Sequence, residues 1–239
     1  MILQDLPKRI MVEGNIGSGK STFLKIIKEK LGIEIIYEPC HKWQNIAGHN
    51  LLDQFYKDPK RWSYTFQTYA FATRIFDQEN SNSSIQIFER SVFSDRFCFA
   101  KNCYESGLMS DLEWQLYNHF FSWLVENYCH KPSGFIYLRT EPETCYQRIL
   151  KRSRSEEASI SLDYIKDLHQ KHENWLVNKI DIPKNLANIP VLIIDCDKEF
   201  EKDLSYQNEI LQKVAEFTNL NYENRAFLNL KMSGIVKGK

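Results

Sequence analysis

Two hydrophobic patterns alternate along most of the chain. Short runs of mainly apolar residues are typical of strands buried on both faces, whereas apolar residues at every third or fourth position are typical of amphipathic helices. The short runs predict strands at residues 9–13, 33–38, 84–89, 134–138 and 190–195. The longer segments predict helices at residues 19–31, 60–79, 92–105, 111–129, 141–152, 162–181 and 203–218. Such alternation indicates an α/β fold, here with a five-stranded parallel sheet flanked by helices.

Residues 1–220 contain no linker that would divide them, so we expect one domain over this range. Residues 221–239 have weak periodicity and end in Lys-Gly-Lys. We expect this last segment to be a loosely ordered tail, because terminal segments without a buried face are seldom held in place.

Composition and charge narrow the range of functions. The 31 basic residues balance the 31 acidic ones, so nothing in the net charge indicates a nucleic acid or an anionic membrane as partner. The 6 cysteines form no C-x-x-C pair, which argues against a disulfide framework and a zinc site. No apolar run approaches the roughly 18 residues that a membrane span needs. The first strand is expected to begin near Arg9, which leaves no room for a leader and predicts a cytoplasmic protein.

The first predicted strand leads into Gly-Asn-Ile-Gly-Ser-Gly-Lys-Ser, which fits the P-loop pattern G-x-x-x-x-G-K-[ST]. Glycines permit the tight turn that points successive N–H groups at phosphates, and the next helix adds its positive N-terminal end. Lys20 would reach the β- and γ-phosphates of ATP, and the Ser21 hydroxyl would bind Mg²⁺. The candidate ATP-binding residues are Gly14, Asn15, Ile16, Gly17, Ser18, Gly19, Lys20, Ser21 and Thr22. The motif alone does not separate kinases from other nucleoside triphosphatases.

Charged residues stand at the ends of the next two strands, Glu38 after one and Glu89-Arg90 after the other. In a parallel sheet these ends face one crevice together with the P-loop. Phosphoryl transfer needs a base, a metal ion and cations near the transferred group. Glu38 can be the base, Glu89 can hold Mg²⁺, and Arg90 can steady the base or the phosphoryl group. Each taken singly could equally be a solvated strand-end charge.

Three arginines, Arg148, Arg152 and Arg154, lie at the end of a predicted helix. Arg148 and Arg152 share a helix face because they are four residues apart. A small mobile lid over ATP would carry arginines in this way, but a basic helix C-terminus favoured by the helix dipole would look the same. The pattern leaves both interpretations open.

Several motifs together resemble those of the deoxyribonucleoside kinase family, in its deoxycytidine/deoxyguanosine kinase branch. The resemblance runs in order from about Arg9 to about Phe217. The motifs that carry it are Glu13-Gly-Asn-Ile-Gly-Ser-Gly-Lys-Ser21, Tyr37-Glu-Pro39 with Trp43, Arg61-Trp-Ser-Tyr-Thr-Phe-Gln-Thr-Tyr69, Glu89-Arg-Ser91 with Ser94-Asp-Arg96, and the segment from Arg148 to Glu157. The family implies a P-loop kinase fold with an arginine-bearing lid, ATP as phosphate donor, Mg²⁺, and a homodimer built through helices such as those at 92–129.

The resemblance also implies roles for single residues. Glu38 would take the proton of the 5′-hydroxyl of a deoxynucleoside, with Arg90 and Lys20 as the other catalytic residues. Tyr56 and Glu157 would contact the 3′-hydroxyl. The implied substrate-binding residues are Glu38, Trp43, Phe55, Tyr56, Gln67, Ala70, Arg74, Arg90, Asp95, Phe99 and Glu157. The implied donor-binding residues beyond the P-loop are the lid arginines Arg148, Arg152 and Arg154, with Glu199 and Phe200 near the adenine.

The acceptor base is predicted from Arg74 and Asp95, which thymidine-preferring relatives lack. Their presence here implies that deoxycytidine, deoxyadenosine or deoxyguanosine is preferred over thymidine. Phe55 and the short stretch 45–52 are less typical of that branch, so a broader kinase that also takes thymidine is a second interpretation. The motifs are also compatible with a nucleoside monophosphate kinase and with a non-catalytic, kinase-like nucleotide-binding subunit. Periodicity alone would have placed Gln67 and Arg74 on an exposed helix face.

Overall fold

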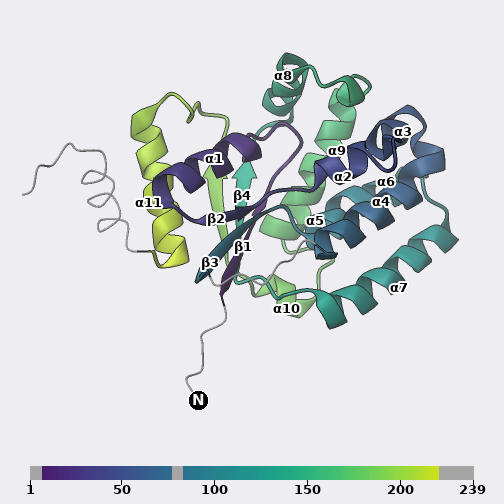
Figure 1. Ribbon diagram of the computed structural model, residues 1–239, viewed down its shortest axis with the longest axis horizontal. Coiled ribbons are helices and arrows are strands. Elements are labelled where there is room, and N and C mark those ends of the chain that lie inside the picture. Colours follow the sequence, from purple (N-terminus) through teal and green to yellow (C-terminus); the bar gives the residue numbers. More distant parts are fainter. Residues whose placement is uncertain (1–6, 77–82, 221–239) are drawn as a thin grey trace, which may run out of the picture.

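The computed structural model describes residues 7–76 and 83–220. Its strands form one parallel sheet in the order β2-β3-β1-β4-β5 (Figure 1). The strands are β1 (Lys8–Glu13), β2 (Glu34–Ile36), β3 (Ile85–Glu89), β4 (Gly134–Arg139) and β5 (Val191–Asp195). The predicted α/β fold with a five-stranded parallel sheet is therefore confirmed. The strand after residue 33 is shorter than predicted, because the chain leaves the sheet at Tyr37 and reaches Glu38 outside it.

Helices connect the strands and cover both faces of the sheet. The α-helices of at least seven residues are α1 (Lys20–Leu31), α3 (Leu51–Lys57), α4 (Pro59–Phe76), α7 (Asp111–Tyr128), α8 (Pro142–Arg152), α9 (Leu162–His172) and α11 (Leu204–Thr218). The shorter α-helices are α2 (Cys40–Gln44), α5 (Val92–Ser94), α6 (Lys101–Glu105) and α10 (Lys184–Ala187). Two π-helical turns, η1 (Asp95–Ala100) and η3 (Glu173–Val177), and one 3₁₀ turn, η2 (Ser155–Glu157), complete the described elements.

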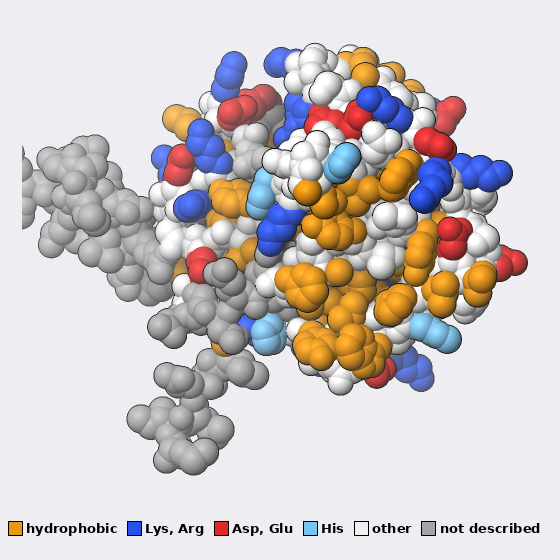
Figure 2. Space-filling view, turned by 45° about the vertical axis from the view of Figure 1, so that its right-hand side comes forward, with side chains coloured by type: hydrophobic (Ala, Val, Ile, Leu, Met, Phe, Trp, Pro, Cys, Tyr) orange, Lys and Arg blue, Asp and Glu red, His pale blue; other side chains and the backbone are white. Residues whose placement is uncertain are grey.

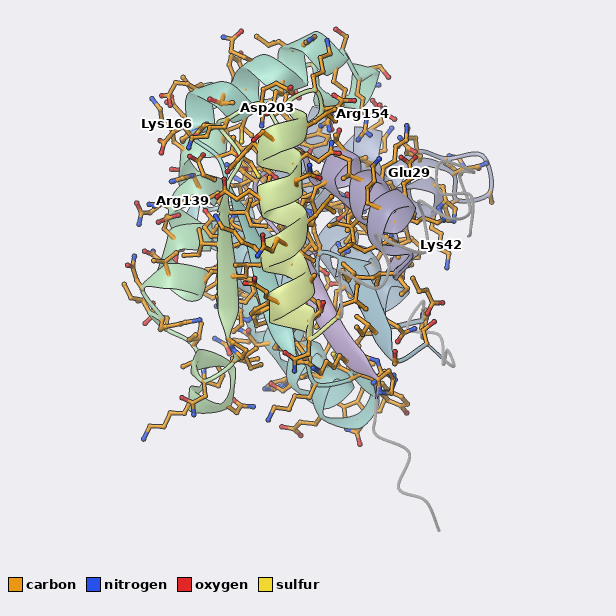
Figure 3. All side chains as sticks on the ribbon, turned by 90° about the vertical axis from the view of Figure 1, so that its left-hand side faces the viewer. Glu29, Lys42, Arg139, Arg154, Lys166 and Asp203 are labelled. Carbon is orange, nitrogen blue, oxygen red and sulfur yellow. The ribbon has the colours of Figure 1, made fainter. Side chains whose placement is uncertain are left out.

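The core has two layers, one on each side of the sheet. On one side α1 and α11 pack against strand residues such as Val12 and Ile136, and Figure 3 shows α11 lying along that face. On the other side α4, α7 and η3 pack against residues such as Phe88 and Phe135. A third apolar cluster lies between α2, α3, α4 and α7, away from the sheet. This third cluster forms the wall of the site described below.

The predicted helices differ from the observed ones where the chain is least regular. The helix predicted at 92–105 is one continuous helical run, but η1 widens its middle into a π turn. The helix predicted at 162–181 ends at Val177. The short helices α2, α3 and α10 were not predicted, because elements of seven residues or fewer carry too little periodicity to detect. Residues 77–79 of the predicted helix 60–79 and the predicted tail 221–239 lie outside the described residues.

Candidate active site

A cleft of about 630 Å³ opens where β1, β2 and β3 end. The P-loop, Glu38 and the pair Glu89-Arg90 all line it, so the predicted convergence of the strand ends is confirmed. Every site residue predicted from the sequence lines this cleft except Gly14, Asn15 and Ser18. The cleft continues from the P-loop past α2, α3 and α4, so it has room for two ligands side by side.

The P-loop is held in its turned shape by contacts from within the loop and from its neighbours. Gly17 has a φ of 80°, and a side chain there would overlap the carbonyl oxygen of Cys145. The Lys20 Nζ donates to the carbonyl oxygens of Gly14 at 3.1 Å and Asn15 at 2.7 Å. The Asn15 side chain donates to the carbonyl oxygen of Ile165 at 2.8 Å, which ties the loop to α9. The loop residues that do not line the cleft therefore shape it.

Lys20 is nearly enclosed at the floor of the cleft. Burial, and then the nearby positive charge of Arg90, lower the pKa of Lys20 to about 7. An anionic phosphate placed beside this amine would favour its charged form. The position of Lys20 therefore suits a group that binds phosphate oxygens.

Glu38 is ionised and held by two arginines. Its Oε1 accepts a hydrogen bond from Arg74 Nη2 at 2.8 Å and lies 3.3 Å from Arg90 Nε. Burial alone would raise the pKa of Glu38, but Arg74 and Arg90 outweigh it and bring the pKa to about 2. The carboxylate is thus fixed in place and ionised at neutral pH.

Arg74 connects Glu38 to Asp95. Its Nε and Nη2 donate to the two carboxylate oxygens of Asp95 at 2.8 and 3.0 Å, a bidentate pair. Its Nη1 donates to the carbonyl oxygen of Glu89 at 3.2 Å. Burial would lower the pKa of Arg74, but Asp95 and Glu38 raise it, so it stays charged. The exposed position that periodicity gave for Gln67 and Arg74 is wrong, since both are buried and line the cleft.

Arg90 has a strained backbone, and its side chain contacts Glu38, the P-loop and Phe99. Its φ of 64° lies in the left-handed region, which is costly for a residue with a side chain and is typical of functional sites. Its Nη1 donates to the carbonyl oxygen of Gly14 at 2.8 Å, and its guanidinium lies 4.7 Å from the centre of the Phe99 ring. This conformation aims Arg90 between Glu38 and the P-loop.

Comparison with known proteins agrees with this geometry. Residues 10–219 match the sequence model of the deoxynucleoside kinases. The chain belongs to the deoxynucleoside kinase family. It is therefore an ATP-dependent phosphotransferase, as the P-loop and the family motifs predicted.

Three relatives illustrate the range of the family. The kinase is 42% identical over 218 residues to a probable deoxycytidine kinase of fowlpox virus (strain NVSL), covering 90% of each chain. It is 38% identical over 239 residues to deoxycytidine kinase 2 of Gallus gallus, covering 88% of this chain and 90% of the relative. It is 40% identical over 196 residues to the mitochondrial thymidine kinase 2 of Homo sapiens, covering 82% of this chain and 73% of the relative.

Arg148 and Arg152 on α8, and Arg154 just after it, all line the kinase cleft. Arg148 Nη2 donates to the carbonyl oxygen of Cys196 at 2.8 Å, while its Nη1 is buried with no hydrogen-bond partner among the described residues. Arg152 pairs with Glu157 at distances down to 2.6 Å, and Arg154 lies 3.6 Å from the same carboxylate. Glu157, predicted to contact the acceptor, is thus also tied to the lid arginines.

Glu199 and Phe200, expected near the adenine of ATP, both line the cleft. A side chain at Gly19 would come within 3.1 Å of the Phe200 ring, so the ring lies directly over the loop. The Glu199 carboxylate accepts hydrogen bonds from the backbone N–H groups of Glu201 at 2.8 Å, Lys202 at 2.7 Å and Asp203 at 3.2 Å. The Glu199 carboxylate therefore shapes its own loop. Of the two side chains, Phe200 is the one that could stack on the flat ring of a ligand.

Some residues that line the kinase cleft were not predicted. They are Cys40, Leu52, Phe66, Lys151, Tyr164 and Glu201. The Phe66 ring stacks on Phe55 at a centroid distance of 4.7 Å and meets Trp43 edge-on at 5.5 Å. The signal for Phe66 was available, because it lies four residues before Ala70 and so shares the face of α4 that had been assigned to the substrate. Tyr164 and Leu52 carry no such signal, since chain folding alone brings them to the cleft.

Proposed function

We propose that the protein transfers the γ-phosphate of ATP to the 5′-hydroxyl of a deoxynucleoside, with Mg²⁺. The observation that carries this proposal is the ionised Glu38 carboxylate, held by Arg74 and Arg90 in the same cleft as the P-loop. A phosphate donor on the P-loop and a hydroxyl at Glu38 would meet within that cleft. Deoxynucleoside salvage is the role that this reaction serves.

Glu38 is proposed to act as the general base. It would take the proton of the 5′-hydroxyl while that oxygen bonds to the γ-phosphorus, and the bond to the bridging oxygen of ADP breaks. A carboxylate with a pKa of about 2 is a weak base in the resting site. If the charge of Arg90 moved toward the transferred phosphoryl group, Glu38 would lose one of its two cations and its pKa would rise. Arg90 and Lys20 would together offset the negative charge of the phosphate oxygens.

Ser21 and Glu89 are proposed to hold Mg²⁺. The Ser21 hydroxyl lies 3.2 Å from Glu89 Oε1, which places two hard oxygen donors together beside Lys20. No group of three or more His, Cys, Asp or Glu side chains suited to a metal occurs among the residues that the structure describes. The pair of oxygens from Ser21 and Glu89 suits Mg²⁺, which commonly uses one or two protein oxygens together with phosphate oxygens and waters. Bound there, the ion would neutralise charge on the β- and γ-phosphates.

The acceptor is proposed to lie between the aromatic wall and the pair Arg74–Asp95. Trp43, Phe55 and Phe99 would flank the base, and Gln67 would meet its edge. The Asp95 carboxylate accepts and the Arg74 guanidinium donates, so the pair complements a base with an amino group next to a ring nitrogen. Deoxycytidine, deoxyadenosine and deoxyguanosine carry such an edge, and thymidine carries a carbonyl group in place of the amino group. The first three are therefore the proposed substrates.

A broader kinase that also accepts thymidine is the second candidate. The 40% identity to a thymidine kinase 2 favours it. The two candidates differ in a single measurable quantity, the relative kcat/KM for thymidine.

A homodimer built on α7 is also part of the proposal. Leu112, Leu116, Phe120 and Trp123 form an exposed apolar stripe on α7, of which Trp123 is 54% exposed. Figure 2 shows apolar side chains gathered on this side of the molecule. The opposite side of α7 is buried through Trp114 and Tyr117, so the helix is apolar on both sides. Within residues 7–76 and 83–220, no element covers the side that carries the stripe. A second copy of α7 would provide that cover.

A cytoplasmic location remains a proposal from the sequence. Within the described ranges, 7–76 and 83–220, no helix has the length and apolar character needed to cross a bilayer. One relative is named a mitochondrial thymidine kinase 2 and another a mitochondrial deoxyguanosine kinase. Cell fractionation would determine the compartment of this protein.

The decisive experiment is a phosphorylation assay with ATP and Mg²⁺ across the four deoxynucleosides and their monophosphates. We expect phosphorylation of the nucleosides, and Glu38→Gln should lower kcat by about 10²- to 10⁴-fold while ATP binding is retained. Glu29→Gln is the matched control, because Glu29 is exposed on α1 and lies away from the cleft (Figure 3). Activity on monophosphates alone would indicate a nucleoside monophosphate kinase. Nucleotide binding without any transfer would indicate the non-catalytic subunit.

A further inference from the structure

Two adjacent acidic residues in the lid turn η2 point in different directions. Glu157 is buried, lines the cleft and pairs with Arg152. Glu156 is half-buried and lines no part of the cleft. Its Oε1 accepts hydrogen bonds from Gln44 Nε2 at 3.0 Å and from Asn50 Nδ2 at 3.2 Å. We call these three residues, Gln44, Asn50 and Glu156, the clasp.

The clasp joins the lid to the wall of the acceptor site. Gln44 follows Trp43 on α2, and Asn50 is the N-cap of α3, the helix that carries Phe55 and Tyr56. A second tie lies close by, where Ser159 Oγ donates to the carbonyl oxygen of Tyr56 at 3.4 Å. The segment that carries the aromatic wall and the arginine-bearing segment are therefore joined by side-chain hydrogen bonds.

The geometry of the turn couples Glu156 to its neighbour. A 3₁₀ turn has three residues per turn, so consecutive side chains diverge by about a third of a circle. When Glu156 is fixed against Gln44 and Asn50, Glu157 is fixed toward the cleft. Hydrogen bonds from its own backbone N–H, Asn50 and Gln44 outweigh burial and lower the pKa of Glu156. It is therefore ionised at neutral pH and accepts charge-assisted hydrogen bonds.

Without the clasp, Glu157 has strong partners on one side only. Arg152 and Arg154 both pair with it and would draw it toward the donor half of the cleft. We infer that Glu156 is a positioning residue, which through Gln44 and Asn50 keeps Glu157 beside Tyr56 and so sets recognition of the 3′-hydroxyl of the acceptor. This inference rests on the proposed function, in which Tyr56 and Glu157 contact that hydroxyl.

The test variant is Asn50→Asp. The Asn50 Oδ1 accepts the backbone N–H of Asp53 at 2.9 Å and caps α3, and aspartate caps a helix as well as asparagine does. The substitution therefore preserves α3 but replaces the donor that faces Glu156 with a carboxylate oxygen. Adding Glu156→Gln supplies a new donor to Asp at position 50, and this double variant should restore the clasp. Glu156→Gln alone keeps an oxygen that can accept from Gln44 and Asn50, so it should behave nearly as the unchanged protein does.

The readout is the ratio of kcat/KM for a 2′-deoxynucleoside to that for the matching 2′,3′-dideoxynucleoside. Asn50→Asp should lower this ratio by roughly three- to tenfold, the range of one or two hydrogen bonds at a partly exposed site. Activity on the dideoxynucleoside should stay unchanged, and the double variant should recover the ratio. A general structural defect would instead lower activity on both substrates alike.

Three results would overturn the inference: an unchanged ratio in Asn50→Asp, an equal loss on both substrates, or no recovery in the double variant. A failure of the proposed function would appear separately, in the unchanged protein. It would fail to phosphorylate deoxynucleosides, or it would show no preference for a 3′-hydroxyl before any substitution is made.

Discussion

Glu13, the last residue of β1, offers the sharpest quantitative test of the structure. Its side chain is fully buried, and its Oε1 accepts a hydrogen bond from Ser91 Oγ at 2.5 Å. Its Oε2 is buried without a hydrogen-bond partner among the described residues. Burial raises the pKa of Glu13 from 4.5 to about 7, although Ser91 and Arg90 act to lower it. The folded protein therefore binds this proton more tightly than the unfolded chain does.

The sign of the effect follows from this difference. Below pH 4.5 the carboxyl group is protonated in both states, and its full contribution to the free energy of unfolding is present. As the pH rises toward 7 the unfolded chain releases the proton first, so that contribution is progressively lost. A pKa that differs between 4.5 and about 7, at about 1.36 kcal/mol for each pH unit, corresponds to about 3.4 kcal/mol in total. About 2.5 kcal/mol of this is lost between pH 5 and pH 8, because the unfolded chain has already released most of its proton at pH 5.

Glu13→Gln removes the titration and keeps an oxygen that accepts from Ser91 Oγ. The free energy of unfolding of the variant should therefore rise by about 2.5 kcal/mol relative to that of the unchanged protein as the pH is raised from 5 to 8. Urea unfolding at several pH values measures this difference directly, because contributions from all other titrating groups cancel between the two proteins. Glu29→Gln, at an exposed position on α1, is the control for the loss of one carboxylate. A difference for Glu13→Gln that does not change with pH would refute the buried-carboxyl reasoning.

Three further predictions concern the site and the dimer. Arg74→Gln removes one of the two cations beside Glu38, so the pKa of Glu38 should rise and activity should be lost at a higher pH. The acid limb of the pH profile of kcat/KM should move up by about 1–2 units, and an unmoved limb would show that Glu38 is not the titrating base. Phe55→Met breaks the stack on Phe66, and it should raise kcat/KM for purine relative to pyrimidine deoxynucleosides by roughly 10-fold in competition assays. Trp123→Asp should convert a dimer to monomers in sedimentation experiments while the circular dichroism spectrum of the folded chain is kept, since Trp123 is exposed in the single chain; a dimer that persists would place the interface elsewhere.

The sheet could be predicted from the sequence because its strands are buried on both faces. Residues such as Ile10, Val12 and Ile87 are almost completely buried, so each strand appears as a short apolar run with little polar interruption. The order of those strands in the sheet was not predicted. Strand order depends on which crossover each helix makes, and periodicity does not contain that information.

Site residues could be predicted from the sequence where their signal lies within one short segment of the chain. The P-loop is one continuous segment, and Glu38 and Arg90 follow recognisable strands. Gln67 and Arg74 needed the family resemblance, because a polar residue on a helix looks exposed until its buried partner is known. Arg74 can be buried because two carboxylates neutralise it, those of Glu38 and of Asp95, which η1 carries.

The clasp could not have been predicted at all. Gln44, Asn50 and Glu156 are ordinary polar residues in short elements, and more than a hundred positions separate the first two from the third in the chain. Their hydrogen bonds exist because α3 packs against the lid turn, which is a tertiary contact. Such contacts leave no periodic signal in a single sequence.

The arrangement of Arg74 has a consequence for how substrate choice and catalysis relate. One guanidinium donates to Asp95, which in the proposed function would face the acceptor base, and to Glu38, which would face its 5′-hydroxyl. A change at Asp95 that accommodates a different base would leave Arg74 with Glu38 as its remaining carboxylate partner. That would strengthen the Arg74–Glu38 pair, lower the pKa of Glu38 further and weaken it as a base. Altered base preference in this site should therefore lower kcat as well as change KM, unless position 74 changes together with position 95.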